Sequence, residues 1–411
     1  MRILWLSHFV PYPPSGGALQ RTFHLLRHAA ERHEVHLLAL NQPRLLSTPA
    51  AVQDATDALA KLCASVRVIP IPAERSRLHR MFAAARAVLG PDPFDVVWLR
   101  NTEFRDAAIE RLTMSVDLVH VDTIGLWPVV DTCRRSPIVL GHHNIESELI
   151  LRRAAHETGW RARILTRDAS KLRKLEQRAS ARAAMNVVVS SLDGGRLESI
   201  APGAGVEVVD NGVDTEYWRP TTTSAENNGI IFAGTLGWYP NRDAVEFLVS
   251  QIWPLLSSSN QGRRLFLVGR DPPEMARQAA ETDPRIQVTG FVPDVRPYMR
   301  DAAIALCPIR VGGGTRLKIL DALAMAKPLV STAVGIEGLD LIEGKHYLRA
   351  ESAAEFVDQI RLLESDSDLR RQLGAAGRQA VVERYDWSVI GRQLDSAYAR
   401  AVSGASQIES R

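Results

Sequence analysis

Residues 286–339 read IQVTGFVPDVRPYMRDAAIALCPIRVGGGTRLKILDALAMAKPLVSTAVGIEGL. An apolar run, Ile304–Cys307, predicts a buried strand, and three glycines follow at 312–314. The stretch Arg316–Ala326 predicts a helix, and Pro328 opens a further apolar strand. Strand, glycine turn and helix in this order predict a parallel α/β sheet with this turn at its carboxyl edge.

The glycine turn and the helix after it have the chemistry of an anion site. Glycines let backbone N–H groups converge on an anion, and a helix N-terminus adds partial positive charge. Lys318 in the first turn adds a full charge, and Asp321 lies one turn deeper on the same face. A diphosphate bound there would place its ribose beside Asp321, whose oxygens accept hydrogen bonds from hydroxyls. The pattern predicts a nucleoside diphosphate site; a tight loop before a buried helix is the alternative that the turn alone leaves open.

Several motifs, in the same order, resemble those of the retaining family-four glycosyltransferases, which have the GT-B fold. The resemblance covers nearly the whole chain and includes the glycine turn described above. It rests on a strand opening at Arg2, PPSGG (13–17), VVVSSLDGGRL (187–197), DNGVDTEYW (210–218), FAGTLGWYPNRDAVEFL (232–248), LFLVGR (265–270), GFVPDVRPYM (290–299), TRLKILDALAMAKPLVST (315–332) and GIEGL (335–339).

The resemblance implies an α/β protein of GT-B architecture, with two Rossmann-like parallel-sheet domains facing across a cleft. It implies that a sugar passes from a nucleoside diphosphate sugar to a hydroxyl, with retention, by same-face attack without a protein nucleophile. Lys318 and the helix N-terminus are expected to stabilise the departing diphosphate without a metal ion, and no other cofactor is expected. The acceptor is a glycan, a lipid-linked sugar or a small molecule, and the sequence does not choose among them.

Two departures from the family pattern bear on the donor. Many members carry two glutamates eight positions apart, and this chain has Gly313 and Asp321 there. The carboxylate that contacts ribose is kept as Asp321, whereas the one that contacts the donor sugar is lost. Where many relatives have an arginine after the strand at Phe232, this chain has Thr235.

The candidate site residues lie in loops and at helix ends. The candidate catalytic groups are Lys318 and His143, which follows the strand Ile138–Leu140. The resemblance, aligned by the spacing from Pro137, puts His143 at the position that faces the donor sugar and phosphate. A histidine suits that position, because it donates a directional hydrogen bond without a fixed charge. The alternative for the pair His142–His143 is that one caps a turn and the other is exposed. For Asn211, Trp238 and Asn241, the sequence does not decide between a packing role and contact with a ligand. The donor-binding candidates, each of which has a purely structural alternative, are Gly16, Gly17, Gly313, Gly314, Thr315, Arg316, Asp321 and Glu337.

Three parts are expected along the chain. Residues 1–222 are predicted to form an acceptor-side domain, 223–386 a donor-side domain, and 387–411 a helix that crosses back to the first domain. The polar stretch PTTTSAENNG (220–229) is the predicted linker. Strand candidates in the first half include Val96–Leu99 and Leu118–Val121. No GxGxxG follows the first strand, which disfavours a dinucleotide-dependent oxidoreductase.

Composition and charge exclude several classes of protein. The 411 residues suffice for two domains, and a formal charge of +3 gives no argument for nucleic acid. Three scattered cysteines indicate neither a disulfide framework nor a zinc site. With no signal peptide and no membrane-length apolar run, a cytoplasmic protein is expected. The basic stretches 152–182 and 75–86 are either solvated surface or a peripheral contact with the inner face of the membrane.

Two other functions remain open at this level. A nucleotide-sugar epimerase on the same fold would act on the donor without an acceptor. A non-catalytic partner of another glycosyltransferase would bind nucleotide without turnover, and the lost carboxylate at Gly313 is compatible with that.

Overall fold

The structure is a computed structural model that describes residues 1–74, 76–220, 229–257 and 262–409. The chain divides into two compact units. Unit 1 comprises Met1–Asp210 with Ile390–Arg411, and unit 2 comprises Asn211–Val389. The domain boundaries predicted from the sequence lie near residues 222 and 386. Most of the predicted linker, 221–228, lies outside the described residues.

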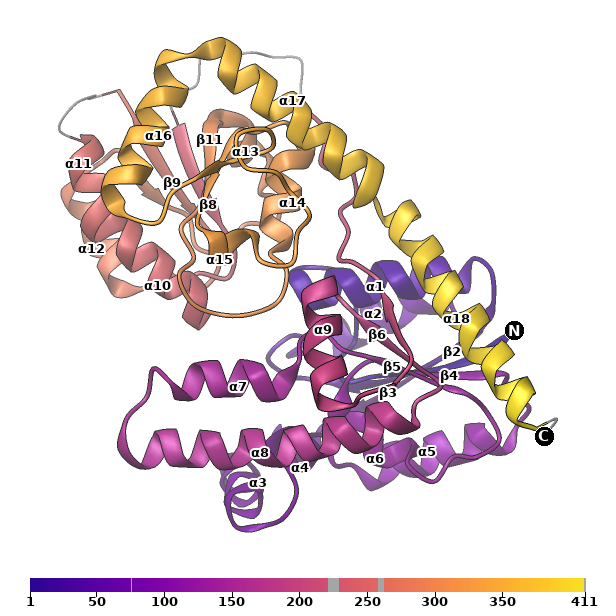
Figure 1. The fold of residues 1–411 in the computed structure, drawn as a ribbon. Helices are drawn as coiled ribbons and strands as arrows, with labels where there is room; N and C mark the ends of the chain where they lie inside the picture. The colour runs from indigo at the N-terminus through magenta and orange to yellow at the C-terminus, as the bar shows by residue number, and fades with distance from the viewer. Residues whose placement is uncertain (75, 221–228, 258–261, 410–411) are drawn as a thin grey trace. The chain divides into compact units, whose positions relative to one another are not determined.

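Unit 1 is built on one sheet of seven parallel strands with helices on both faces (Figure 1). Its strand order is β3-β2-β1-β4-β5-β6-β7, so β1 lies beside both β2 and β4. The strands are β1 (Arg2–Ser7), β2 (Glu34–Asn41), β3 (Ser65–Pro70), β4 (Leu118–Val121), β5 (Ile138–Gly141), β6 (Met185–Val188) and β7 (Val206–Val208).

The helices of unit 1 connect these strands in sequence. They are α1 (Gly17–Ala30), α2 (Pro49–Ala60), α3 (Arg77–Leu89), α4 (Phe94–Leu99), α5 (Thr102–Thr113), α6 (Trp127–Val130), α7 (Glu146–Ala154), α8 (Gly159–Arg182) and α9 (Ser191–Ile200), with short 3-10 turns at Pro72–Glu74 and Ile124–Leu126. The predicted strand Val96–Leu99 is wrong, because these residues form α4. A short apolar run is buried equally well by a strand or by one helical turn, and Val96, Val97 and Leu99 are buried here in the helical form.

Both faces of the unit 1 sheet are packed. Leu4 and Leu6 of β1 belong to a core cluster with Phe104 of α5 and Leu172 of α8. Trp5 points to the opposite face, as strand alternation requires, and its ring stacks on His120 of β4 at 3.8 Å. Burial on both faces explains why these strands read as continuous apolar runs.

Unit 2 contains a six-stranded parallel sheet in the order β10-β9-β8-β11-β12-β13. Its strands are β8 (Gly229–Ala233), β9 (Arg264–Val268), β10 (Ile286–Val288), β11 (Ala302–Cys307), β12 (Leu329–Ser331) and β13 (Leu348–Arg349). Its helices are α10 (Tyr239–Phe247), a π-helical turn (Leu248–Ile252), α11 (Trp253–Ser257), α12 (Glu274–Thr282), α13 (Arg296–Asp301), α14 (Leu317–Ala324), α15 (Ala333–Ile336), α16 (Ala353–Ser365) and α17 (Ser367–Arg384). Two parallel sheets, each with helical crossovers, confirm the predicted fold class.

The last helix, α18 (Trp387–Glu409), packs against unit 1 from Ile390 onward. Tyr398 Oη lies 3.0 Å from His120 Nδ1, and Asp395 Oδ2 lies 2.9 Å from His28 Nε2 of α1. Gly391 fits against the His28 ring only without a side chain, since a Cβ there would lie 2.1 Å from Nδ1. These contacts fix the C-terminal helix to the unit in which the chain begins.

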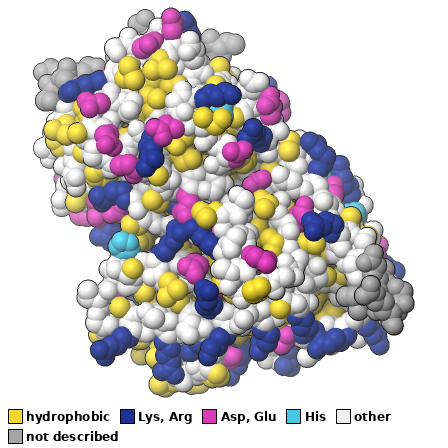
Figure 2. Space-filling view, in the orientation of Figure 1, with side chains coloured by type: hydrophobic (Ala, Val, Ile, Leu, Met, Phe, Trp, Pro, Cys, Tyr) yellow, Lys and Arg dark blue, Asp and Glu magenta, His cyan; other side chains and the backbone are white. Residues whose placement is uncertain are grey.

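Among the described helices, none is long and apolar enough to cross a membrane. Figure 2 shows hydrophobic, basic and acidic side chains interspersed over the face it draws, with Lys and Arg side chains gathered along the lower edge, where α8 lies in Figure 1.

Candidate functional site

The glycine turn between β11 and α14 requires glycine at two of its three positions. Gly312 has φ +117° and Gly314 has φ +74°, values that side chains other than glycine rarely adopt. Arg316 is the residue just before α14, and its guanidinium turns back onto the turn. It donates to the carbonyl of Gly313 at 2.5 Å and also to the carbonyl of Gly314. Arg316, predicted to contact the nucleotide-sugar donor, therefore stabilises the glycine turn through hydrogen bonds to the backbone of that turn.

Lys318 is held in place by residues from other parts of unit 2. Its Nζ donates to Asn241 Oδ1 at 2.6 Å and lies 4.0 Å from the centre of the Phe232 ring. Asn241 in turn donates to the carbonyl of Thr235 at 2.8 Å. Burial lowers the pKa of Lys318 to about 8. Asn241, which the sequence left open, is thus the residue that positions the candidate phosphate-binding cation.

Asp321 lies three residues beyond Lys318 and carries an unusual carboxyl group. Its Oδ1 atom is buried and accepts no hydrogen bond from the described residues. Burial raises the pKa of Asp321 to about 8, although the charge of Lys318 acts in the opposite direction. Buried polar atoms are normally paired, so this oxygen is an exception among the buried polar atoms of the described residues.

The loop after β8 presents bare backbone to Lys318. Gly234, after β8, has φ +147°, and a Cβ there would lie 2.8 Å from Lys318 Nζ. A Cβ on Gly269, after β9, would lie 1.6 Å from the carbonyl oxygen of Gly234. No side chain fits at either position, so the chain can approach a ligand closely at this edge of the sheet.

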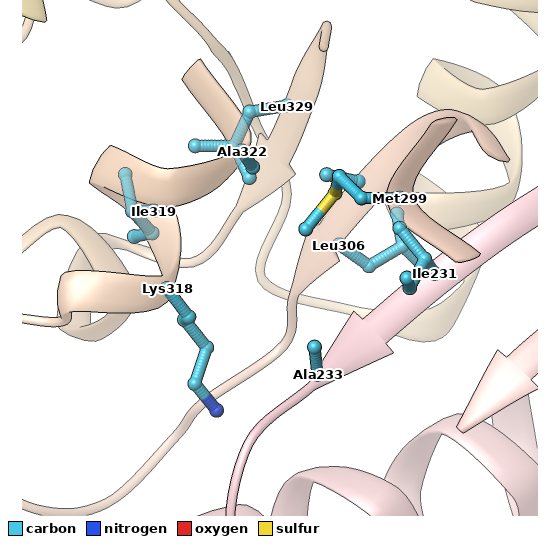
Figure 3. Close-up of a pocket in the computed structure, with 9 residues that line it drawn as sticks. Ile231, Ala233, Met299, Leu306, Lys318, Ile319, Ala322 and Leu329 are labelled. Carbon is cyan, nitrogen blue, oxygen red and sulfur yellow. The ribbon is translucent and has the colours of Figure 1, made fainter. Parts of the chain in front are cut away.

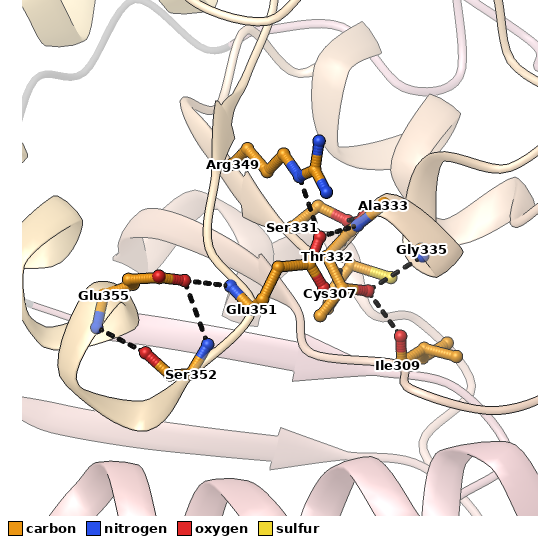
Figure 4. A network of polar contacts seen from close by, with 10 residues as sticks. All are labelled: Cys307, Ile309, Ser331, Thr332, Ala333, Gly335, Arg349, Glu351, Ser352 and Glu355. Carbon is orange, nitrogen blue, oxygen red and sulfur yellow. Dashed lines mark hydrogen bonds and ion pairs between the residues drawn. The ribbon is translucent and has the colours of Figure 1, made fainter.

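The loops after β11 and β12 are tied together, as Figure 4 shows. Thr332 donates to the carbonyl of Ile309 and accepts from the backbone N–H of Gly335 at 2.9 Å. Glu351 accepts from the backbone N–H of Ala333 at 2.9 Å. Glu337, a predicted donor contact, directly follows α15 in this braced segment.

The remaining predicted residue of the turn, Thr315, receives a hydrogen bond from the side chain of Asn211. Asn211 is buried and belongs to unit 2. A residue 104 positions earlier in the chain therefore fixes the start of α14.

A narrow apolar cavity lies beneath α14, between the helix and the sheet (Figure 3). It is lined by Ile231, Ala233, Met299, Ala305, Leu306, Lys318, Ile319, Ala322 and Leu329, and holds about 10 Å³, the space of roughly one water molecule. Lys318 lines this cavity and also belongs to the candidate site. The cavity is part of the core packing and offers no room for a nucleotide.

In unit 1, three polar side chains meet at the carboxyl ends of the neighbouring strands β1, β4 and β5. They are His8, Asp122 and His143, each placed one or two residues after its strand. His143 Nε2 lies 3.3 Å from Asp122 Oδ1, and His8 Nδ1 lies 3.6 Å from Asp122 Oδ2. The predicted catalytic histidine is therefore one member of a His–Asp–His cluster.

Asp122 is the buried centre of this cluster. Thr22 of α1 donates to it at 3.0 Å, and Ser7 Oγ lies 3.3 Å from it. Burial opposes ionisation, but His143 and His8 outweigh it and hold the pKa of Asp122 below its ordinary value. Burial also lowers the pKa of His8. Asp122 is thus an ionised hydrogen-bond acceptor facing two imidazoles.

Sequence reasoning missed His8 and Asp122. A signal was present, because each follows an apolar strand as His143 does. The three residues meet because β1, β4 and β5 are neighbours in the sheet. Local sequence patterns do not predict the order of strands in a sheet.

The other unit 1 candidates separate into two environments. His142 is buried and bonds through Nε2 to Asn186 Oδ1 at 3.1 Å, and burial lowers the pKa of His142 to about 4. His142 is therefore a neutral packing residue, in contrast to His143. Gly16 and Gly17 stand exposed at the start of α1, where Gly16 has φ +112° and a Cβ on it would meet no atom within 4 Å.

The His–Asp–His cluster has ligand atoms suited to a metal ion. One nitrogen from each histidine and one oxygen of Asp122 all lie within 4.8 Å of one another, the one such group of three among the described residues. Imidazole and carboxylate are ligands of Zn²⁺ and other divalent metals. The hydroxyl groups of Ser7 and Thr22 also donate hydrogen bonds to Asp122, so its carboxylate has partners within the protein.

The arrangement of strands and loops has solved counterparts. Sucrose-phosphate synthase from Thermosynechococcus elongatus matches with a TM-score of 0.71 over 98% of this chain and 100% of that one, at 16% sequence identity. Anabaena HepE in complex with UDP and glucose matches with a TM-score of 0.67 over 97% and 99% of the two chains, at 15% identity. The fold is that of the GT-B glycosyltransferases.

Sequence comparison identifies the family. The family described as Glycosyltransferase Family 4 matches residues 15–217, and that described as Glycosyl transferases group 1 matches residues 227–366. The chain belongs to these glycosyltransferases, which confirms the resemblance seen in its motifs. Phosphatidyl-myo-inositol mannosyltransferase of Mycobacterium leprae is 29% identical over 151 residues, a match that spans 36% of this chain and 40% of that relative.

Proposed function

We propose that this glycosyltransferase takes its sugar from a nucleoside diphosphate sugar bound at the N-terminus of α14. The observation that carries the proposal is the buried, unpartnered Oδ1 of Asp321 one helical turn from Lys318. Leaving such an oxygen without a donor is unfavourable, and the hydroxyls of a ribose would supply donors. Bound UDP in the structural counterpart HepE supports a nucleotide ligand for this fold.

We propose that the diphosphate leaves from this site without the help of a metal ion. Lys318 supplies a positive charge within a partly buried site, where electrostatic interactions are stronger than in water. The N-terminus of α14 and the glycine backbone add N–H donors. We propose that these groups stabilise the charge that develops on the diphosphate. Transfer then proceeds with retention, by attack of the acceptor from the face that the diphosphate leaves.

We propose that His143 contacts the transferred sugar and its phosphate when substrate is bound. Asp122 beside it would hold its imidazole in one orientation, as a carboxylate partner does for a catalytic histidine. His8 would complete this arrangement from the other side of Asp122. In this role Asp122 acts through His143 and is a positioning residue.

The acceptor is proposed to be a hydroxyl of a glycan, a lipid-linked sugar or a small molecule. The mycobacterial relative is named for phosphatidyl-myo-inositol, which supports a hydroxyl-bearing acceptor that can be attached to lipid. We propose that the enzyme works in the cytoplasm, with a peripheral contact at the inner face of the membrane.

Thermal stability tests the donor site directly. The protein is heated with UDP, GDP, dTDP or ADP, each with added Mg²⁺ and after treatment with EDTA. A ligand that binds the folded state raises the unfolding midpoint, by about 2.7 kcal/mol of stability at 100 times its dissociation constant. We expect one nucleotide to raise the midpoint irrespective of metal, and Asp321→Ala to abolish that rise.

The outcomes separate the alternatives. Binding that requires Mg²⁺ would contradict the metal-free site. Binding without sugar transfer, when acceptors that relatives use are supplied, would favour a non-catalytic partner. Conversion of the donor sugar in the absence of any acceptor would favour an epimerase.

A further inference from the structure

Helix α3 of unit 1 turns its large apolar side chains outward. Leu78 is 76% exposed, Met81 68%, Phe82 71% and Leu89 80%. Exposed leucines are ordinary when scattered, but four large apolar residues on one 13-residue helix are not scattered.

These residues share one face. The positions 78, 81, 82, 85 and 89 follow the helical spacing i, i+3, i+4, i+7 and i+11, and Ala85 occupies the fifth. The side that is buried consists of small residues, chiefly Ala83 and Ala87. The helix therefore rests on the protein through alanines and leaves its more hydrophobic face uncovered.

Basic residues border the apolar face. Arg77, Arg80 and Arg86 are exposed, form no ion pair with the described residues, and share the helix with no Asp or Glu. Lys171 of α8 donates to the carbonyl of Ala87 at 2.5 Å, so α8 lies directly beside the end of α3. Helix α8 contributes further exposed cations that have no ion-pair partner among the described residues, namely Arg163, Arg167 and Lys174.

The surface of unit 1 thus combines an apolar stripe with a basic border. In Figure 2, hydrophobic and basic side chains lie together along the lower edge, which corresponds to α3 and α8 in Figure 1. Of the acidic residues close by, Asp92 pairs with Arg100 and Glu74 with Arg44. Asp95 of α4 and Asp168 of α8 lie nearby as well, and burial raises the pKa of both carboxyl groups. Exposed cations therefore outnumber the acidic groups around the uncovered apolar helix.

We propose that α3 docks in the interface of a membrane that carries anionic lipids, with Leu78, Met81, Phe82 and Leu89 inserted among the acyl chains. The arginines would remain at the level of the head groups, where each cation is attracted to an anionic surface. A helix of this length reaches only about 20 Å, so it lies in the interface and does not span the bilayer. A second copy of the chain is a poorer occupant, because it would bring an equally basic border against this one.

The inference deepens the proposed function, because it rests on the proposed peripheral contact with the membrane and assigns that contact to α3. Lipid binding needs neither nucleotide nor acceptor. It can be measured by sedimentation of the full chain with vesicles of phosphatidylcholine alone, or of phosphatidylcholine mixed with an equal part of phosphatidylglycerol. We expect the protein to sediment with the mixed vesicles and to remain in solution with phosphatidylcholine.

Two sets of variants separate insertion from simple charge attraction. The triple variant Leu78→Ser, Phe82→Ser, Leu89→Ser should lower partitioning at least roughly tenfold, because it removes the apolar contact. Arg77→Gln, Arg80→Gln and Arg86→Gln should each lower it by roughly fivefold. Met275→Ser with Leu362→Ser, exposed apolar positions of unit 2, is the matched control and should leave partitioning unchanged.

Three results would overturn the inference. They are absence of binding to any vesicle, unchanged binding of the serine triple variant, and self-association of the native chain in light scattering that the same variant abolishes. Nucleotide-dependent thermal stability is recorded on every variant. Absence of nucleotide-dependent stabilisation, with vesicle binding retained, would contradict the proposed donor site and leave the proposed docking surface supported.

Discussion

Nζ of Lys318 donates a 2.6 Å hydrogen bond to Oδ1 of Asn241, a residue 77 positions earlier in the chain. This bond aims the ammonium group at the carboxyl edge of the unit 2 sheet, beside the bare backbone of Gly234. A lysine held in this way is preorganised for an anion, because it need not be ordered when the anion arrives.

Replacing this lysine should remove the diphosphate contact. Lys318→Ala is expected to weaken binding of the preferred nucleoside diphosphate by roughly 10- to 100-fold, the value of a charge-assisted hydrogen bond. Calorimetric titration provides the measurement. Lys345→Ala, an exposed lysine of the same unit, is the control and should bind as the native protein does. Native affinity in Lys318→Ala would remove Lys318 from the site.

Binding should also depend on pH in the range where Lys318 titrates. The pKa of Lys318 is lowered to about 8, so the ammonium is charged at pH 7 and largely neutral at pH 9. Affinity for the nucleoside diphosphate is therefore expected to fall between these values. Lys318→Arg keeps its charge throughout this window, and its affinity should vary less with pH. Equal pH dependence in the two proteins would assign the titration to another group.

Asp321 should discriminate nucleotides from simple phosphates. Without ligand Asp321 holds its proton near neutral pH, and two ribose hydroxyls that donate to it would favour its carboxylate form. Asp321→Asn preserves shape but offers one acceptor oxygen in place of two, so nucleoside diphosphate binding should weaken roughly 10-fold or more. Inorganic diphosphate, which has no ribose, should bind both proteins alike in the same titration. Parallel losses for the two ligands would show that Asp321 supports the phosphate site instead.

The same carboxyl group should make folding stability depend on pH. Burial raises the pKa of Asp321 from 3.8 to about 8, so the folded state holds its proton where the unfolded chain has released it. Its contribution to stability is present below pH 4 and is lost as the pH rises through about 8. Asp321→Asn should therefore lose less stability between pH 5 and pH 9 than the native protein does. Denaturant unfolding at the two pH values measures the difference, and identical losses would contradict the raised pKa.

The cluster in unit 1 should affect turnover more than nucleotide affinity. Asp122→Asn removes the negative charge that faces His143, so kcat is expected to fall roughly 10- to 100-fold, in the range typical of general acid–base and orienting groups. Nucleotide affinity should fall much less than kcat, because the proposed main contacts of the nucleotide, Lys318 and Asp321, belong to unit 2. The exposed Asp54→Asn of α2 is the control, and an equally large loss of nucleotide affinity in Asp122→Asn would argue against this division of roles.

Local patterns predicted much of this fold. The apolar run, the glycine turn and the helix of residues 304–326 appear as β11, the turn and α14, and the helix ends two residues earlier than expected at Ala324. The assignment of Val96–Leu99 was wrong because burial of a short apolar run does not specify its backbone conformation. Periodicity needs length to distinguish a strand from a helix.

Proximity within the candidate site could be predicted where its residues are neighbours in sequence, and was missed where they converge from different strands. Lys318 and Asp321 follow from helical spacing alone. Asn241 beside Lys318, and His8 and Asp122 beside His143, depend on strand order and on side-chain rotamers. The role of Arg316 inside the turn likewise depends on which way its guanidinium folds, and its residue type is compatible with either direction.

The most direct test of the donor site is a crystal structure of the protein with the nucleoside diphosphate that stabilises it most. We expect ribose hydroxyls within hydrogen-bond distance of Asp321 Oδ1, and the diphosphate against Lys318 Nζ and the first N–H groups of α14. A nucleotide bound with its ribose away from Asp321, or outside unit 2 altogether, would contradict this expectation.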